Sequence, residues 1–177
     1  MTVQFAKLKR LGVQAIIGEV YGSSAPVLFR NWFEAKVPAL MAHNGASVSA
    51  QTFIDQYRNM VEGAIINNRW WPAKYTDLSE PMIEAYTKKV GSPPTNFSVP
   101  AFDSLIVIAE AAKAAGVDAE KMRGALESTT FKTAWGMRKF TPLAEGHRMP
   151  IQTVVVQIQD GKKVPIYPET VAKQAGG

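Results

Sequence analysis

Cysteine is absent from this sequence of 177 residues, so disulfide bonds, metal sites with thiolate ligands and cysteine nucleophiles are excluded. Histidine is scarce as well. His43 and His147 are the only two, and neither stands in an H-x-x-x-H or H-x-x-E pattern that would bring two metal ligands together. No G-x-G-x-x-G motif is present, and no lysine follows Gly22 in the glycine-containing segment 18–24. The sequence therefore predicts no bound metal and no cofactor.

Long apolar runs are also missing. No segment approaches the roughly 18 apolar residues that a membrane-spanning helix needs. The first ten residues, MTVQFAKLKR, lack the apolar core of a secretory signal, so we expect neither a membrane span nor a leader in this sequence. With 46% hydrophobic and 20% charged residues, the composition is typical of a globular chain that buries one core of moderate size.

The net charge of +5 raises the question of a nucleic-acid partner. The cations occur in small scattered groups: Lys7, Lys9 and Arg10; Lys88 and Lys89; Arg138 and Lys139; Lys162 and Lys163. Such groups are typical of solvated helix faces and turns. We therefore expect no nucleic-acid partner.

The first 67 residues alternate between helical and strand patterns. Helices are expected at 2–11, 26–33 and 48–57, and strands at 15–17, 39–42 and 63–66. The apolar strand at 15–17 is expected to be buried on both faces, and the alternation predicts a parallel sheet. Ligands of such sheets bind beyond the carboxyl ends of the strands. Here those ends carry Glu19, Tyr21, His43 and Asn44, with Gly45 closing the second strand.

The segment NNRWWPAKYTD fits neither periodicity, and we place a boundary after residue 69. Helices are expected at 79–90 and 99–115 and after Asp118, followed by one short strand near 135–140. Strands at 153–159 and 163–167 should form a hairpin about Asp160-Gly161, before a frayed tail. The helix at 99–115 is apolar almost all round and is expected to be buried.

These three helices and one short strand have no sheet of their own to cover. We expect the helices to form a small bundle, or to pack on strands from another chain or from a part of the protein outside this sequence.

Five segments together resemble one family: LKRLGVQAIIGEVYGSS, VEGAIIN, VPAFDSLIVIAEAAKAAGVDAEKMRGALESTTF, WGMRKFTPLAEGHRM and VVVQIQDGKKVPIYP. In this order and spacing they resemble the type 1 periplasmic binding proteins of the branched-chain amino acid (Leu/Ile/Val-binding) class. These proteins are the solute receptors of ABC importers. The resemblance covers almost the whole sequence, which corresponds to the carboxyl-terminal half of such a receptor.

The resemblance implies a partial bilobal α/β fold, with a parallel three-layer α/β/α lobe, helices of the other lobe and a carboxyl-terminal β-hairpin. Residues 1–69 would form an α/β segment of the second lobe, and 70–148 a helical segment of the first lobe with one short strand. Residues 149–177 would return to the second lobe with the hairpin and tail. The implied partners are a small solute, the membrane subunits of the importer, and either the missing amino-terminal half or a second copy. The implied location is the periplasm.

The resemblance also assigns residues at the strand ends. Tyr21 matches the aromatic residue that contacts the solute from the second lobe, and Asn44 falls where receptors for α-amino acids place a carboxylate that binds the ammonium group. With an uncharged amide there, an ammonium group would lose a charge-assisted hydrogen bond of roughly 1.5 to 3 kcal/mol. Glu19 shares one side of the extended segment with Tyr21 and could replace that carboxylate. We therefore expect an amide, an aromatic acid or another solute that is not an amino acid, in preference to leucine.

Three further expected ligand-binding residues have two interpretations each. Ser23 either caps the following helix or helps its free N–H groups to bind a carboxylate. His43 is expected to form a hydrogen bond at the rim of the cleft or to the solute. Trp70 either packs at the hinge or forms a wall of the cleft, where it could stack on an aromatic solute.

No catalytic residue is expected. Ser23, His43 and Glu19 could form a triad on paper, but the G-x-S-x-G motif that would project the serine is missing. We therefore expect a solute-binding protein and not an enzyme. The alternatives are a ligand-sensing regulatory domain of the same fold and, less favoured, a small α/β hydrolase.

Overall fold

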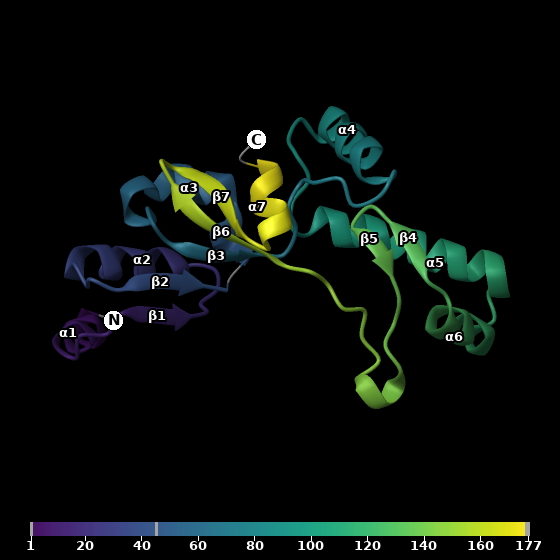
Figure 1. Cartoon of the computed structure of the whole chain (residues 1–177), viewed down its shortest axis with the longest axis horizontal. Coiled ribbons are helices and arrows are strands. Elements are labelled where there is room, and N and C mark those ends of the chain that lie inside the picture. The colour runs from purple at the N-terminus through teal and green to yellow at the C-terminus, as the bar shows by residue number, and fades with distance from the viewer. Residues whose placement is uncertain (1, 45, 176–177) are drawn as a thin grey trace. The chain divides into compact units, whose positions relative to one another are not determined.

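The computed structural model describes residues 2–44 and 46–175 (Figure 1). The chain divides into two compact units. We call the part up to Arg69, together with the part from Thr153 onward, the sheet unit, and the part from Trp70 to Gln152 the helical unit. The boundaries predicted from the sequence lie between residues 69 and 70 and between residues 148 and 149. In the structure, the boundaries between the units lie between residues 69 and 70 and between residues 152 and 153. Gly45, expected to close the second strand, lies outside the described residues.

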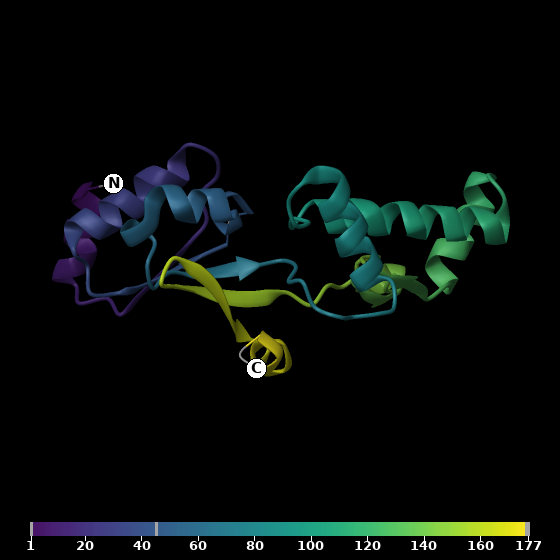
Figure 2. The same ribbon diagram turned by 90° about the horizontal axis from the view of Figure 1, so that it is seen from above.

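The sheet unit is built on one mixed sheet. Its strands follow the spatial order β1 (Ala15–Gly18), β2 (Leu40–His43), β3 (Ile65–Asn68), β6 (Val154–Gln159) and β7 (Lys162–Tyr167). The first three are parallel to one another, and β6 and β7 are antiparallel to their neighbours. Helices α2 (Ser24–Ala35) and α3 (Gln51–Tyr57) lie on one face, and α7 (Glu169–Ala175) lies on the other (Figure 2). The predicted three-layer α/β/α arrangement is therefore confirmed.

Strand β1 differs from its prediction. The apolar run at 15–17 predicts burial on both faces, but the Ile17 side chain is 82% exposed. The reason is topological, because β1 is the edge strand of the described sheet and pairs only with β2. Strand β3 begins two residues later than predicted. Gly63 has a φ of +75°, which is a left-handed and not an extended conformation.

The helices of the sheet unit follow the sequence with two corrections. Helix α1 (Thr2–Arg10) buries Phe5 as its apolar pattern predicts. The helix predicted at 48–57 is broken at Ala50, whose extended backbone separates a short turn, η1 (Ala46–Ser49), from α3. The tail that we expect to fray forms α7, anchored by the buried side chain of Val171.

The helical unit contains three long helices and a small hairpin. The elements are α4 (Ser79–Val90), α5 (Ser98–Ala115), α6 (Ala119–Ser128), β4 (Phe131–Thr133) and β5 (Gly136–Arg138). The prediction of a single strand near 135–140 is wrong. Gly136 has a φ of +111°, which few other residues adopt, and the chain reverses there into two strands. Across residues 2–44 and 46–175, no helix has both the length and the apolar character to cross a membrane.

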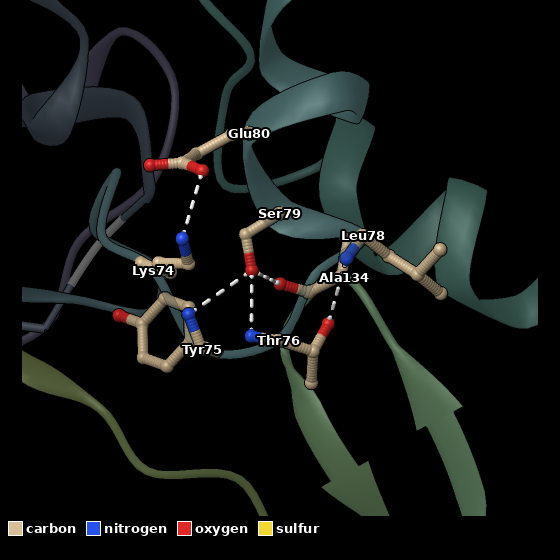
Figure 3. A network of polar contacts seen from close by, with 7 residues as sticks. All are labelled: Lys74, Tyr75, Thr76, Leu78, Ser79, Glu80 and Ala134. Carbon is tan, nitrogen blue, oxygen red and sulfur yellow. Dashed lines mark hydrogen bonds and ion pairs between the residues drawn. The ribbon is translucent and has the colours of Figure 1, made fainter.

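Ser79 joins the start of α4 to the β4–β5 hairpin. Its hydroxyl oxygen accepts the N–H groups of Tyr75 and Thr76 at 3.0 and 2.9 Å, and its O–H donates to the carbonyl oxygen of Ala134 at 2.8 Å (Figure 3). The Thr76 hydroxyl donates to the carbonyl oxygen of Thr133 at 2.7 Å. Helix and hairpin are therefore held together by buried polar groups as well as by apolar packing.

Helix α5 has one buried side and one exposed side. Val99, Val107 and Ala111 are buried in two apolar clusters of the helical unit. We call the opposite side, Phe102, Leu105 and Ile108, the apolar face of α5. All three are exposed, and Leu105 is 68% exposed. The prediction that this helix is buried all round is wrong for the described chain.

Asp103 is the polar residue on the buried side of α5. Its two carboxylate oxygens accept the N–H groups of Ala134 at 2.9 Å and Trp135 at 3.1 Å, at the turn of the hairpin. Burial raises the pKa of Asp103, an effect opposed by the hydrogen bonds that the carboxylate accepts and by the positive charge of Arg138. The guanidinium of Arg138 itself stacks over the Trp135 ring at 5.1 Å. Asp103 thus ties the middle of α5 to the hairpin.

We predict that Asp103→Asn destabilises the helical unit by about 1–3 kcal/mol, because the amide replaces one acceptor oxygen with a donor that then opposes a buried N–H of the hairpin turn. Denaturant unfolding followed by tryptophan fluorescence measures the change. Glu110→Gln is the matched control, because Glu110 lies on the same helix but pairs with Lys113 at the surface and should change stability by less than about 0.5 kcal/mol. Equal stability of the two variants would contradict the assigned role.

Candidate functional site

The carboxyl ends of the three parallel strands lie at one edge of the sheet. Gly18 at the end of β1 is paired with His43 at the end of β2, and His43 is paired with Ile66 in β3. In open α/β sheets this edge is where ligands bind. The residues at this edge, which we call the strand-end cluster, are Glu19, Tyr21, His43, Asn44 and Asn67.

Two amides bridge the ends of β2 and β3. The Asn67 side chain donates from Nδ2 to Oδ1 of Asn44 at 2.8 Å. The backbone N–H of Asn44 donates to the carbonyl oxygen of Gly18 at 3.2 Å, which ties Asn44 to the end of β1 as well. Asn44 is exposed, and with Oδ1 engaged its Nδ2 remains to donate outward. This arrangement offers a solute a hydrogen-bond donor.

Glu19 and Tyr21 form a pair on the loop after β1. The Tyr21 hydroxyl donates to Oε1 of Glu19, and the Tyr21 side chain is 61% exposed. This hydrogen bond is the main cause that raises the pKa of Tyr21, with smaller contributions from desolvation and the charge of Glu19. The positive charge of Arg69 acts in the opposite direction. The pair therefore presents a phenol that donates a hydrogen bond to a carboxylate.

His43 lies beneath this loop and not on its surface. The side chain is 2% exposed, and its ring packs against that of Phe29 with 5.7 Å between centroids. Nε2 accepts the N–H of Val20 at 3.1 Å, and Nδ1 is buried with no partner among the described residues. Burial lowers the pKa of His43, against the attraction of the Glu19 carboxylate. The unfolded chain therefore takes up a proton more readily, and this group's contribution to stability is lost as the pH falls below about 6.5.

The other two expected ligand-binding residues have different surroundings. Ser23 is exposed at the N-cap position of α2, but its side chain makes no capping hydrogen bond. Trp70 is 3% exposed within the apolar cluster of the helical unit, beside Met82 and Val99, and its backbone N–H donates to Asn96. The structure thus brings Glu19, Tyr21, His43 and Asn44 together and makes Trp70 a core residue.

Ser23, His43 and Glu19, which could form a triad on paper, are not connected as one in the described chain. Neither nitrogen of His43 is hydrogen-bonded to Ser23 in the part of the chain that the structure describes, because Nε2 is occupied by Val20. The Glu19 carboxylate is paired with Tyr21 instead.

Sequence reasoning missed Asn67 and Arg69. The sequence places both in the segment NNRWWPAKYTD, which fits neither periodicity, although Asn67 is the penultimate residue of β3. The rule that identified Glu19 and Asn44 would have identified Asn67, had β3 been extended by two residues.

A surface hollow of about 580 Å³ lies away from the strand-end cluster, beside the turn between β6 and β7. The polar groups that line it are largely paired with one another. Glu62 accepts the N–H groups of Asp160 and Gly161 at 2.8 and 3.1 Å, and Gln51 donates to Asp55 at 2.9 Å. The hollow is therefore a mixed-charge groove.

The fold of the chain is that of the type 1 periplasmic binding proteins, as solved structures show. A leucine-binding protein from Thermotoga maritima matches with a TM-score of 0.78 and 18% identity, over 93% of this chain and 47% of that protein. A leucine-, isoleucine-, valine-, threonine- and alanine-binding protein from Brucella ovis gives 0.79 and 19%, over 93% and 45%. A solute-binding protein from R. palustris, solved with benzoate, gives 0.73 and 14%, over 93% and 45%.

The family model described as periplasmic binding protein matches residues 1–163, and the chain belongs to this family. The resemblance drawn from the five sequence segments is thereby confirmed. No curated protein sequence matches the chain. The chain spans 45% to 47% of the length of the three solved structures above, which is about half of such a protein.

We predict that Glu19→Gln lowers the pKa of Tyr21, because the variant loses the hydrogen bond to a carboxylate and the nearby negative charge. Arg69→Gln is the counterpart and should raise the same pKa, because it removes the opposing positive charge. Ultraviolet difference titration measures both, with Tyr21→Phe identifying the signal among the five tyrosines. Shifts of the same sign in the two variants would refute this account of the pair.

Proposed function

We propose that the chain is the solute-binding component, or the carboxyl-terminal part of it, of an ABC importer in the periplasm. It would hold a small solute and deliver it to the membrane subunits without chemical conversion. Membership of the periplasmic binding protein family supports this proposal, as do the open polar groups at the carboxyl ends of β1, β2 and β3. We propose that Tyr21, Asn44 and Glu19 contact the solute directly.

The proposed solute is a small amide or aromatic acid, with α-amino acids as the less favoured class. The observation that carries this choice is the hydrogen bond from Asn67 to Oδ1 of Asn44. It orients the Asn44 amide so that Nδ2 is free to donate. An ammonium group finds no anion at this uncharged side chain, whereas a carbonyl or carboxylate oxygen finds the Nδ2 donor. The Glu19 carboxylate is the alternative anion, but it already accepts the Tyr21 hydroxyl.

We predict that a screen of leucine, benzamide, benzoate and urea, read by thermal shift, finds stabilisation by benzamide or benzoate and no turnover of any amide. The screen is run on this chain and on the intact receptor that we propose includes it. We expect weaker binding by this chain, because the intact receptor would supply further contacts. Hydrolysis of an amide would refute the proposed function.

The specificity is tested by Asn44→Asp. A carboxylate at this position keeps the acceptor for Asn67 and adds a negative charge, so leucine binding should improve by about tenfold to a hundredfold, the value of one charge-assisted hydrogen bond. Benzoate binding should weaken. Asn67→Asp is the matched control, because it adds the same charge one strand away and removes the donor that orients Asn44. Leucine binding that is tighter in the native protein than in Asn44→Asp would contradict the assignment.

We also propose a partner for the apolar face of α5. In an intact receptor it would be covered by the amino-terminal half of the protein, and in this chain alone by a second copy. Leu105 and its neighbours on α5 are exposed at a helix face of the kind that normally packs against a sheet or another helix.

We predict that this chain associates as its concentration rises and that Leu105→Glu prevents the association, because a carboxylate on the apolar face cannot be buried without a partner. Size-exclusion chromatography with light scattering measures the mass. Ala114→Glu places the same charge on an exposed position of the opposite side of α5 and should leave the association unchanged. A monomer at all concentrations would refute the proposed self-association.

A further inference from the structure

His43 connects β2 to the loop after β1 through one hydrogen bond. Its Nε2 accepts the N–H of Val20, which stands between Glu19 and Tyr21. Because a backbone N–H can only donate, Nε2 must be unprotonated and the neutral ring carries its proton on Nδ1. We infer that neutral His43 is a positioning residue that holds the loop 19–23 so that Glu19 and Tyr21 can contact a solute, and that protonation of His43 releases this loop.

Protonation removes the acceptor on which the loop depends. An imidazolium carries N–H groups on both nitrogens, so Nε2 would then oppose the N–H of Val20. The ring cannot turn to water, since it is almost fully buried under Phe29. Moving Val20 away is therefore the response that relieves the two opposed donors.

The charges around His43 act on the Glu19–Tyr21 pair. The Glu19 carboxylate attracts a positive charge on His43. That carboxylate also accepts the Tyr21 hydroxyl, so a charged ring competes with Tyr21 for it. Phe29 of α2 packs against the ring and Ile66 of β3 is paired with His43 across the strands, and neither residue titrates. The positive charge of Arg69 acts on Tyr21, whose pKa it lowers. Protonation thus disturbs both the backbone of the loop and the pair that the loop presents.

The hydrogen bond and its loss can be tested without any solute. In ¹⁵N-labelled protein, the Val20 amide resonance should shift with one midpoint, below pH 6.5, that equals the midpoint of the His43 ring. In His43→Gln, whose side-chain oxygen can replace Nε2 as an acceptor, the amide should stay protected and show no such midpoint. In His43→Leu, the Val20 amide should exchange its hydrogen about tenfold faster at pH 7, as expected when a hydrogen bond of ordinary net strength is lost.

His147→Gln is the matched control, because His147 lies in the helical unit and pairs with Glu127 at 3.3 Å. It should leave the Val20 titration unchanged. The inference would be overturned if the midpoint of the Val20 resonance differed from that of the His43 ring, or if the same midpoint persisted in His43→Gln. The titration of the native protein and of His43→Gln decides the matter even where His43→Leu fails to fold.

The consequence for binding rests on the proposed function and has its own readout. Benzamide is uncharged between pH 5 and 7, so its affinity reports the protein alone. As the pH is lowered from 7 to 5, we expect the affinity for benzamide to fall about tenfold in the native protein and by less than about twofold in His43→Gln. An equal fall in both would overturn the coupling of His43 to the solute. Absence of benzamide binding at pH 7 would count against the proposed function, while the Val20 titration would still decide the role of His43.

Discussion

The candidate site depends on the register of three short parallel strands. Gly18, His43 and Ile66 are paired across β1, β2 and β3, so the three strands end at nearly one level. That level brings the N–H of Val20 to His43 and the amide of Asn67 to Asn44. Because side chains alternate between the faces of a strand, a slip of β2 by one residue would turn His43 away from the helices that cover it and separate both contacts.

Several polar groups at this edge are paired with one another before any solute arrives, and the pairing decides what each can offer. Asn44 has its oxygen occupied and its nitrogen free. The Glu19 carboxylate already accepts the hydroxyl of Tyr21. His43 is withdrawn from the surface altogether, and its contribution is to the backbone of the loop. A residue type at a strand end is therefore a poor guide to its role until its hydrogen-bond partner is known.

Much of the fold could be predicted from the sequence, because apolar runs, helix caps and the Asp160-Gly161 turn are local signals. Asp118 caps α6 as predicted, and the hairpin of β6 and β7 forms about the predicted turn. The errors have longer-range causes. Burial of Ile17 depends on whether β1 has a neighbour on its free side, and the fate of Trp70 depends on which cluster of the helical unit encloses it.

The position of the candidate site could be predicted better than the roles of its residues. The rule for parallel sheets located Glu19, Tyr21 and Asn44 correctly at one edge, but a pattern of residue types does not show which face of β2 the covering helices occupy. His43 shares the buried face with Met41, and this follows from the packing of α2 over that face. Asn67 was overlooked because the predicted end of β3 was two residues too early, and such boundaries are set by hydrogen bonds to a strand, β6, that lies far along the sequence.

The apolar face of α5 is exposed, although the apolar pattern of the helix predicts burial. Burying a large apolar side chain is worth about 1.5–3 kcal/mol, so the exposed Phe102, Leu105 and Ile108 leave several kcal/mol unrealised. That amount is comparable to a substantial part of the 5–15 kcal/mol that stabilises an ordinary domain. Asp103, on the other side of the helix, fixes the orientation by binding the hairpin turn. If α5 rotated to hide its apolar face, the buried N–H of Ala134 would lose its acceptor, and the N–H of Trp135 would keep only the Thr133 hydroxyl. The helix is therefore held so that this face points away from the core of the helical unit.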